Sequence, residues 1–144
     1  MHVDIRPEPF DPWQEVAAYR AVQLAGGAIG ACAVFVGTMR DFNEGDSVQA
    51  MQLEHYPGMT EKHLAALVEQ AITTHELSDA LVLHRVGKLT PGADIVLVAT
   101  FSAHRKTAFD ACREIMEALK SSAPLWKKET LASGERWVAE NTPG

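Results

Sequence analysis

Cysteine and long apolar runs are the two features that this chain of 144 residues most clearly lacks. Its two cysteines, Cys32 and Cys112, lie far apart and form neither a CxxC pair nor a Cys/His ligand spacing, so neither a disulfide framework nor a zinc site is indicated. No segment approaches the ~18 uninterrupted apolar residues that a membrane helix needs. The N-terminal stretch also lacks the charged start and apolar segment of a secretory signal. We therefore expect a soluble, cytoplasmic protein that has no membrane partner.

Basic residues are also few, with 13 Lys/Arg against 19 Asp/Glu, which gives a net charge of −6. A general nucleic-acid binder usually carries a basic stripe on a basic domain, so that class of protein is excluded. The sequence has no P-loop pattern, no GxSxG and no Cys/His nucleophile signature. The pairs His55-Tyr56 and His84-Arg85 have no third ligand at metal spacing, which favours structural roles for them. We expect no metal ion and no cofactor.

The apolar pattern predicts a mixed α+β fold with mainly antiparallel strands, in a single domain over residues 1–144. With 47% hydrophobic residues, a chain of this length can bury the core of one domain. The expected helices run from Pro12, after the capping residue Asp11, to about Gly26-Gly27, over residues 60–77 and over residues 104–120. The expected strands cover residues 2–7, 28–38, 48–56, 80–89 and 94–103, and a last hairpin joins LWKKETL to ERWVAE around Ser133-Gly134.

Three of these elements have more specific expectations. The run AIGACAVFVGT, residues 28–38, is apolar and contains a glycine near its end, as in a buried strand. The polar stretch MRDFNEGDS that follows is expected to form a loop. Residues 80–89 and 94–103 flank a turn with the sequence TPGA, which predicts a single hairpin.

Cationic side chains gather in one run, SAHRKTAFDACREIMEALKSSAPLWKKE, residues 102–129. Between His104 and Lys128 there are six Lys/Arg against three acids, a local excess of +3 in a chain whose net charge is −6. The local field matters more to a small anion than the net charge of the whole protein does. This run is therefore the expected place for an anionic substrate.

The two ends of the helix in this run have different possible roles. At its start, His104 and Arg105 stand where free backbone N–H groups and the helix dipole favour an anion, and a guanidinium there could grip a phosphate or carboxylate. The spacing equally allows a helix cap at His104 and a solvated Arg105. Lys120 stands at the other end, where the dipole stabilises a cation even if it has no function.

The remaining cations of interest lie in a strand and in a loop. Lys127 and Lys128 are neighbours in an expected strand, so their side chains point to opposite faces and at most one enters a given pocket. A desolvated lysine, or one among cations, loses proton affinity and can act as an acid or base near neutral pH. A solvated surface pair is the alternative. Arg40 opens the loop after Gly37-Thr38 and could reach the same anion, although loop arginines are mostly exposed.

The chain resembles the large, catalytic subunit of molybdopterin synthase over about residues 28–138. The resemblance lies in five segments: FVGTMRDFNEGDSV, LEHYPGMTEK, HRVGKLTPGADIVLVA, SAHRKTAFDACREIMEALKSSAPLWKKE and GERWV. The resemblance implies an α/β hammerhead-type fold and a sulfurtransferase of molybdenum cofactor biosynthesis. That enzyme converts cyclic pyranopterin monophosphate to molybdopterin by building its dithiolene. The sulfur arrives as the C-terminal thiocarboxylate of a small ubiquitin-like partner subunit, which removes the need for a cysteine nucleophile. A homodimer of the large subunit is expected at the centre of a heterotetramer.

The same resemblance implies a set of site residues. Carried over by motif, the pterin-phosphate pocket takes Thr38, Met39, Arg40, His104 and Arg105, the principal catalytic lysines are Lys120 and Lys127, and Lys128 and Glu129 lie beside them. The two arginines are expected to hold the phosphate and the histidine to orient the pterin. The two lysines are expected to stabilise the thiocarboxylate and to move protons. Residues of a second copy can complete each pocket.

Two other functions stay open. A non-catalytic module could bind the C-terminal tail of a ubiquitin-like protein and use the same cations as a carboxylate clamp. Such a module would bind its partner without sulfur transfer. A phosphate-ester hydrolase is less well supported, because the sequence shows no metal cluster and no activated nucleophile.

Overall fold

The structure is a computed structural model and describes residues 1–23 and 26–139. A central sheet has four strands in the order β1 (His2–Arg6), β5 (Asp79–Arg85), β7 (Asp94–Ser102) and β2 (Ala31–Thr38). Strands β1 and β5 run parallel, and the pairs β5–β7 and β7–β2 are antiparallel. The expected α+β fold with mainly antiparallel strands is confirmed.

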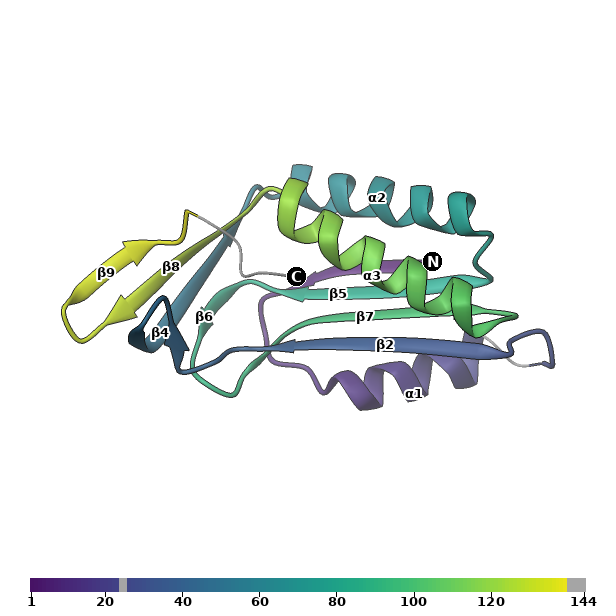
Figure 1. The fold of residues 1–144 in the computed structure, drawn as a ribbon, viewed down its shortest axis with the longest axis horizontal. Coiled ribbons are helices and arrows are strands. Elements are labelled where there is room, and N and C mark those ends of the chain that lie inside the picture. Colours follow the sequence, from purple (N-terminus) through teal and green to yellow (C-terminus); the bar gives the residue numbers. More distant parts are fainter. Residues whose placement is uncertain (24–25, 140–144) are drawn as a thin grey trace.

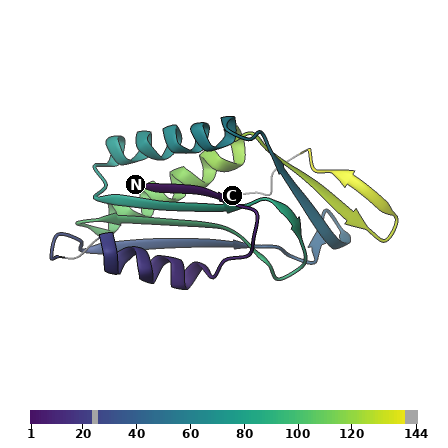
Figure 2. The ribbon, with the colours of Figure 1, turned by 180° about the vertical axis from the view of Figure 1, so that it is seen from behind.

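Helices cover both faces of the central sheet: α1 (Pro12–Gln23) packs on one face, and α2 (Met59–His75) and α3 (Arg105–Ser122) pack on the other (Figure 1, Figure 2). The alternation of side chains along β5 supplies both cores. Leu83 lies in a buried cluster with Val16 of α1. Its neighbour Val82 lies in the opposite cluster, with Leu64 of α2 and Ile115 of α3.

The helix ends follow local chemistry. Asp11 caps α1, because its Oδ1 accepts hydrogen bonds from the backbone N–H groups of Trp13 (3.0 Å) and Gln14 (3.3 Å). This helix is described as far as Gln23, short of the expected end near 26–27, and residues 24–25 lie outside the described part. Helix α3 ends at Ser122, just before Pro124, as expected.

A second sheet extends from one end of the central sheet (Figure 1). Its strands, in order, are β3 (Phe42–Asn43), β4 (Asp46–His55), β8 (Leu125–Leu131) and β9 (Gly134–Trp137), and β6 (Gly87–Leu89) also pairs with β4. The last expected hairpin is confirmed as β8–β9, although Glu140 of its second arm lies outside the described residues. The joint between the two sheets places the C-terminal end of α3 close to the start of β8.

Residues 80–89 and 39–47 differ from expectation. The first run is not one strand, because the chain turns at Gly87, whose φ is +93°, and β6 leaves the central sheet to pair with β4. The second is not an open loop. Phe42 and Asn43 pair with the start of β4 around Glu44 and Gly45, which have φ of +53° and +82° and so make a tight hairpin turn.

The run 28–38 contains the expected strand, β2, but the expectation that this strand is buried was wrong. Strand β2 begins at Ala31 and forms an edge of the central sheet, where it has one neighbour, β7. Its residues Val34 and Phe35 are 36% and 41% exposed. Apolar composition cannot separate an edge strand from a central one, because both can be rich in β-branched residues.

Candidate active site

Two adjoining cavities lie where the two sheets meet, beside the C-terminal end of α3. The larger has a volume of about 290 Å³, and its walls come from β2, β4, β5, β7, α3 and β8. The smaller has a volume of about 120 Å³ and is lined in part by Arg40 and Glu129. Both are lined by Thr38, Lys120 and Lys127, so we treat them as one site and name it the lysine cavity.

Lys120 and Lys127 reach the lysine cavity from different elements. Lys120 lies in the last turn of α3, and Lys127 lies in β8, beyond Pro124. The pKa of Lys127 is lowered to about 8, chiefly by burial and further by the charge of Lys120 and a hydrogen bond with it, against the opposing charge of Glu129. Lys127 can therefore bind or release a proton near neutral pH, which an ordinary solvated lysine does not do.

Thr38, Met39 and Arg40 form the rim of the lysine cavity at the end of β2. The Thr38 hydroxyl donates to Asp94 Oδ1 (3.0 Å), and the backbone N–H of Met39 donates to the Ala93 carbonyl (2.9 Å). Met39 is buried, whereas the neighbouring Arg40 is exposed and lines the smaller cavity. The backbone is thus fixed immediately before Arg40, and its guanidinium stays accessible to an anion.

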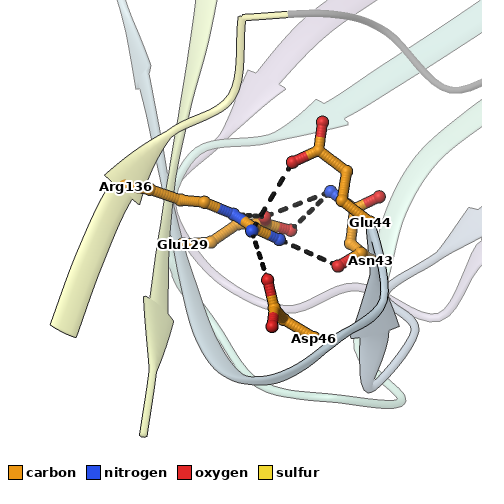
Figure 3. Close-up of polar contacts among 5 residues, drawn as sticks. All are labelled: Asn43, Glu44, Asp46, Glu129 and Arg136. Carbon is orange, nitrogen blue, oxygen red and sulfur yellow. Dashed lines mark hydrogen bonds and ion pairs between the residues drawn. The ribbon is translucent and has the colours of Figure 1, made fainter. Parts of the chain in front are cut away.

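Glu129 and Lys128 lie on opposite faces of β8. Glu129 shares the face of Lys127, is only 5% exposed and accepts hydrogen bonds from Asn43 and Arg136 (Figure 3). Lys128 pairs with Glu135 (3.2 Å) and does not line the lysine cavity. The structure therefore brings Glu129 to the expected site and turns Lys128 away from it.

His84 also lines the lysine cavity, although sequence reasoning favoured a structural role for it. Its side chain is 7% exposed, and its Nδ1 lies 2.7 Å from the Arg85 carbonyl oxygen. Burial lowers the pKa of His84 to about 4, with smaller contributions from the charges of Lys127 and Lys120. The imidazole is therefore neutral near pH 7. Since Nδ1 donates to the carbonyl, Nε2 is a hydrogen-bond acceptor.

His104 and Arg105 do not reach the lysine cavity of the same chain. Both are exposed, at the N-terminal end of α3, and His104 makes no capping hydrogen bond with its side chain. Lys120 is fifteen residues further along α3 than Arg105, which corresponds to about 22 Å along a helix. The helix that carries both groups therefore separates them within one chain.

Other reactive groups are not available for chemistry here. Burial raises the pKa of the Cys112 thiol to about 11, so this side chain is not a thiolate at neutral pH. Cys32 is free and exposed, and burial raises its pKa as well. Among residues 1–23 and 26–139, no group of three His, Cys, Asp or Glu side chains could hold a metal ion. No helix in the described part is long and apolar enough to cross a membrane.

The fold and the site define a class of protein: a two-sheet α+β protein with a pair of half-buried lysines in a cavity at the joint of its sheets. The MoaE protein family model matches residues 5–122. The molybdopterin synthase catalytic subunit of Ralstonia nicotianae is 54% identical over 136 residues, which cover 94% of this chain and 76% of that protein.

Two solved structures share the fold. The molybdopterin biosynthesis MoaE protein from Burkholderia ambifaria superposes with a TM-score of 0.80 at 47% identity, covering 99% of this chain and 92% of that one. Molybdopterin synthase from Staphylococcus aureus superposes with a TM-score of 0.83 at 31% identity, covering 94% and 96%. The chain belongs to the MoaE family, as its sequence motifs predict, and is the catalytic subunit of an enzyme.

Proposed function

We propose that this chain transfers sulfur to cyclic pyranopterin monophosphate to form molybdopterin, and that the sulfur comes from the C-terminal thiocarboxylate of a small ubiquitin-like partner subunit. The observation that carries the proposal is the half-buried pair of Lys120 and Lys127 in the lysine cavity, in which the pKa of Lys127 is lowered to about 8. The relative from Ralstonia nicotianae bears the name of the enzyme that makes this product.

The larger cavity suits the tail of the partner. Its walls are mostly apolar side chains, among them Phe35 and Leu119, and the two lysines stand together in it. An extended C-terminal tail can lie along such walls while its thiocarboxylate meets the lysine pair. A cationic Lys120 stabilises the negative sulfur, and Lys127 accepts and returns the proton that moves as sulfur attacks the pterin side chain.

The stoichiometry of the proposed reaction determines which molecules must enter and leave the site. In each transfer a C–S bond forms at a side-chain carbon of the pterin, and a C–O bond at that carbon breaks, with the oxygen leaving as water or with the opened phosphate ester. A water molecule then attacks the partner's acyl carbon, breaks its C–S bond and turns this group into an ordinary carboxylate. A dithiolene contains two sulfur atoms, so each product molecule consumes two thiocarboxylated partners. A spent partner must therefore leave before the second transfer, which requires a reversible partner interface.

The phosphate of the substrate requires cations that one chain supplies only in part. Arg40 stands at the rim of the lysine cavity, while His104 and Arg105 lie at the other end of α3, where Arg105 is about 22 Å along the helix from Lys120. We propose that a second copy of the chain brings its own His104 and Arg105 to this rim, in a homodimer that carries one small subunit at each end. The phosphate is then held between arginines of two chains.

Alanine substitution of each lysine tests the catalytic assignment. Lys120→Ala and Lys127→Ala should each lower the single-turnover rate by at least about 100-fold and leave the Kd for the thiocarboxylated partner within about threefold. Arg113→Ala is the matched control, because Arg113 pairs with Glu117 on the exposed face of α3. Equal losses of rate and partner affinity would favour the non-catalytic tail-binding module, since an anchoring lysine removes affinity and not a transition-state contact.

A further inference from the structure

Arg136 joins the tip of the β3–β4 hairpin to β8 (Figure 3), and two of its partners, Asn43 and Glu129, line the smaller cavity. From β9, its Nε donates to Glu129 of β8 (3.0 Å), its Nη1 to Asp46 of β4 (2.7 Å) and its Nη2 to the backbone carbonyl of Asn43 in β3 (2.8 Å). Its Nη1 also lies 3.5 Å from a carboxylate oxygen of Glu44. The planar fork of a guanidinium can make all these contacts at once, and the single ammonium of a lysine cannot.

Glu129 is an unexpected group to find in a cavity that gathers cations. It is 5% exposed, and both of its oxygens accept hydrogen bonds from Asn43 Nδ2, each at 3.1 Å. A buried carboxylate is costly unless it is paired. Arg136 is the cation that pairs with Glu129, so it offsets part of the negative charge that Glu129 places beside Arg40, Lys120 and Lys127.

The hairpin β3–β4 carries Arg40 at its root. The backbone is fixed before Arg40 through Met39, and after it through the Asp41 carbonyl, which accepts from the N–H of Val48 (2.9 Å). The tip of the hairpin is acidic, and Arg136 is the cation that holds this tip against β8 and β9. Without it, the carboxylates of the tip and of Glu129 would repel one another.

We propose that Arg136 is a positioning residue of this enzyme, which locks the hairpin that carries Arg40 onto the strand that carries Lys127 and keeps the buried Glu129 paired with a cation. The proposal rests on the sulfur-transfer function proposed above. Arg136 does not line either cavity, so it acts through Arg40 and Glu129 and not by touching the substrate.

The electrostatic half of the proposal has a pH signature. The charged or titratable groups around Lys127 are Lys120 from α3, His84 from β5, Arg40 from the β2–β3 connection and Glu129 from β8 itself. Of these, Glu129 raises the pKa of Lys127. If Arg136 no longer offsets the charge of Glu129, this charge raises the pKa of Lys127 further. The midpoint of the pH–rate profile then moves to higher pH. The direction is the same whether Lys127 acts as a base or as an acid.

The test measures single-turnover rates against pH with the full chain, the thiocarboxylated partner and cyclic pyranopterin monophosphate. Arg136→Met should lower the rate about 10- to 100-fold and move the midpoint up by about one pH unit. Arg136→Lys keeps the charge and loses the fork, so it should restore the midpoint. In both variants the pterin concentration that gives the half-maximal single-turnover rate should rise, because neither side chain holds the hairpin that carries Arg40. The control Arg113→Met should match the wild type in rate and midpoint.

The double variant Arg136→Met/Glu129→Gln distinguishes an effect of Arg136 on the site from a loss of folding stability. It removes both charges of the pair, so it leaves no buried carboxylate uncompensated, and its midpoint should return to the wild-type value even if Arg136→Met folds poorly. A rate loss without a shift of the midpoint, or a shift that persists in the double variant, overturns the proposal. A wild-type chain that forms no product overturns the sulfur-transfer function instead. A wild-type chain that turns over, with an Arg136→Met variant of equal rate and midpoint, overturns only the role of Arg136.

Discussion

The lowered proton affinity of Lys127 is a property that can be measured without any turnover. At pH 7.5, a lysine with a pKa of about 8 is roughly one quarter neutral, whereas a lysine at the ordinary value of 10.5 is about 0.1% neutral. Only the neutral amine reacts with an acylating or arylating reagent. At pH 7.5, Lys127 should therefore be labelled far faster than an exposed lysine, provided that the reagent enters the cavity.

The source of the shift can be tested with one substitution. Lys120→Met removes the neighbouring charge and retains most of the side-chain volume. Since burial is the larger cause of the lowered pKa of Lys127, the pKa in this variant should lie above 8 and still below 10.5. The exposed Lys106, which pairs with Asp110 on the surface of α3, serves as the internal reference in both proteins.

The assay is competitive labelling with a small amine-reactive reagent over pH 6 to 11, with each lysine quantified by peptide mass spectrometry. The wild-type rate for Lys127 should titrate with a midpoint near 8. A wild-type midpoint close to 10.5 would refute the account of a desolvated lysine. An unchanged midpoint in Lys120→Met would refute the coupling between the two lysines.

Three further predictions concern stability. The folded pKa of His84, about 4, lies below its unfolded value of 6.5, so the unfolded state binds more protons between these values. The free energy of unfolding should therefore fall as the pH drops from 6.5 to 4, by on the order of 3 kcal/mol. Denaturant titrations at each pH should show this loss in the wild type but not in His84→Gln. Gly37→Ala should destabilise the fold by about 1–3 kcal/mol, because a Cβ there would lie 2.7 Å from Val96 Cγ1 in the cavity wall; a melting temperature equal to that of the wild type would contradict this. Asp11→Ala should cost about 1 kcal/mol through loss of the α1 cap, and Asp11→Asn should restore most of it.

The sequence was sufficient for elements whose signals are local. Asp11 before Pro12 predicted the start of α1, and Pro124 predicted the end of α3. The alternation of side chains in a strand predicted that only one of Lys127 and Lys128 enters a pocket, and the structure places Lys127 there. These features depend on neighbours within a few residues, so no tertiary information was needed.

Features that depend on distant pairing could not be predicted in this way. Nothing in the apolar run around His84 shows that the end of β5 borders a cavity, because that depends on how the second sheet meets the first. The change of sheet at Gly87 depends on β4 as a partner. Arg136 lies opposite Glu129 only in the β8–β9 register, and a two-residue turn assumed at 132–133 would have indicated that pairing.

One constraint on the site was already present in the sequence. The pterin-phosphate pocket was expected to take His104 and Arg105, and a helix spans about 22 Å between Arg105 and Lys120. The predicted helix over 104–120 already contained this distance. Motif resemblance supplies residues without saying which copy of the chain they come from, and helix length can supply that constraint.

The most direct test of the central claim is a single-turnover reaction of this chain with a thiocarboxylated small subunit and cyclic pyranopterin monophosphate, in which dithiolene product and the mass of the partner are followed together. The account predicts that product appears at the rate at which the partner exchanges sulfur for oxygen, with two partners consumed for each product. In Lys127→Ala, neither the product nor the mass change of the partner should appear. Tight partner binding with the sulfur retained and no product would contradict it, and would make the lysine cavity a site that only binds the tail.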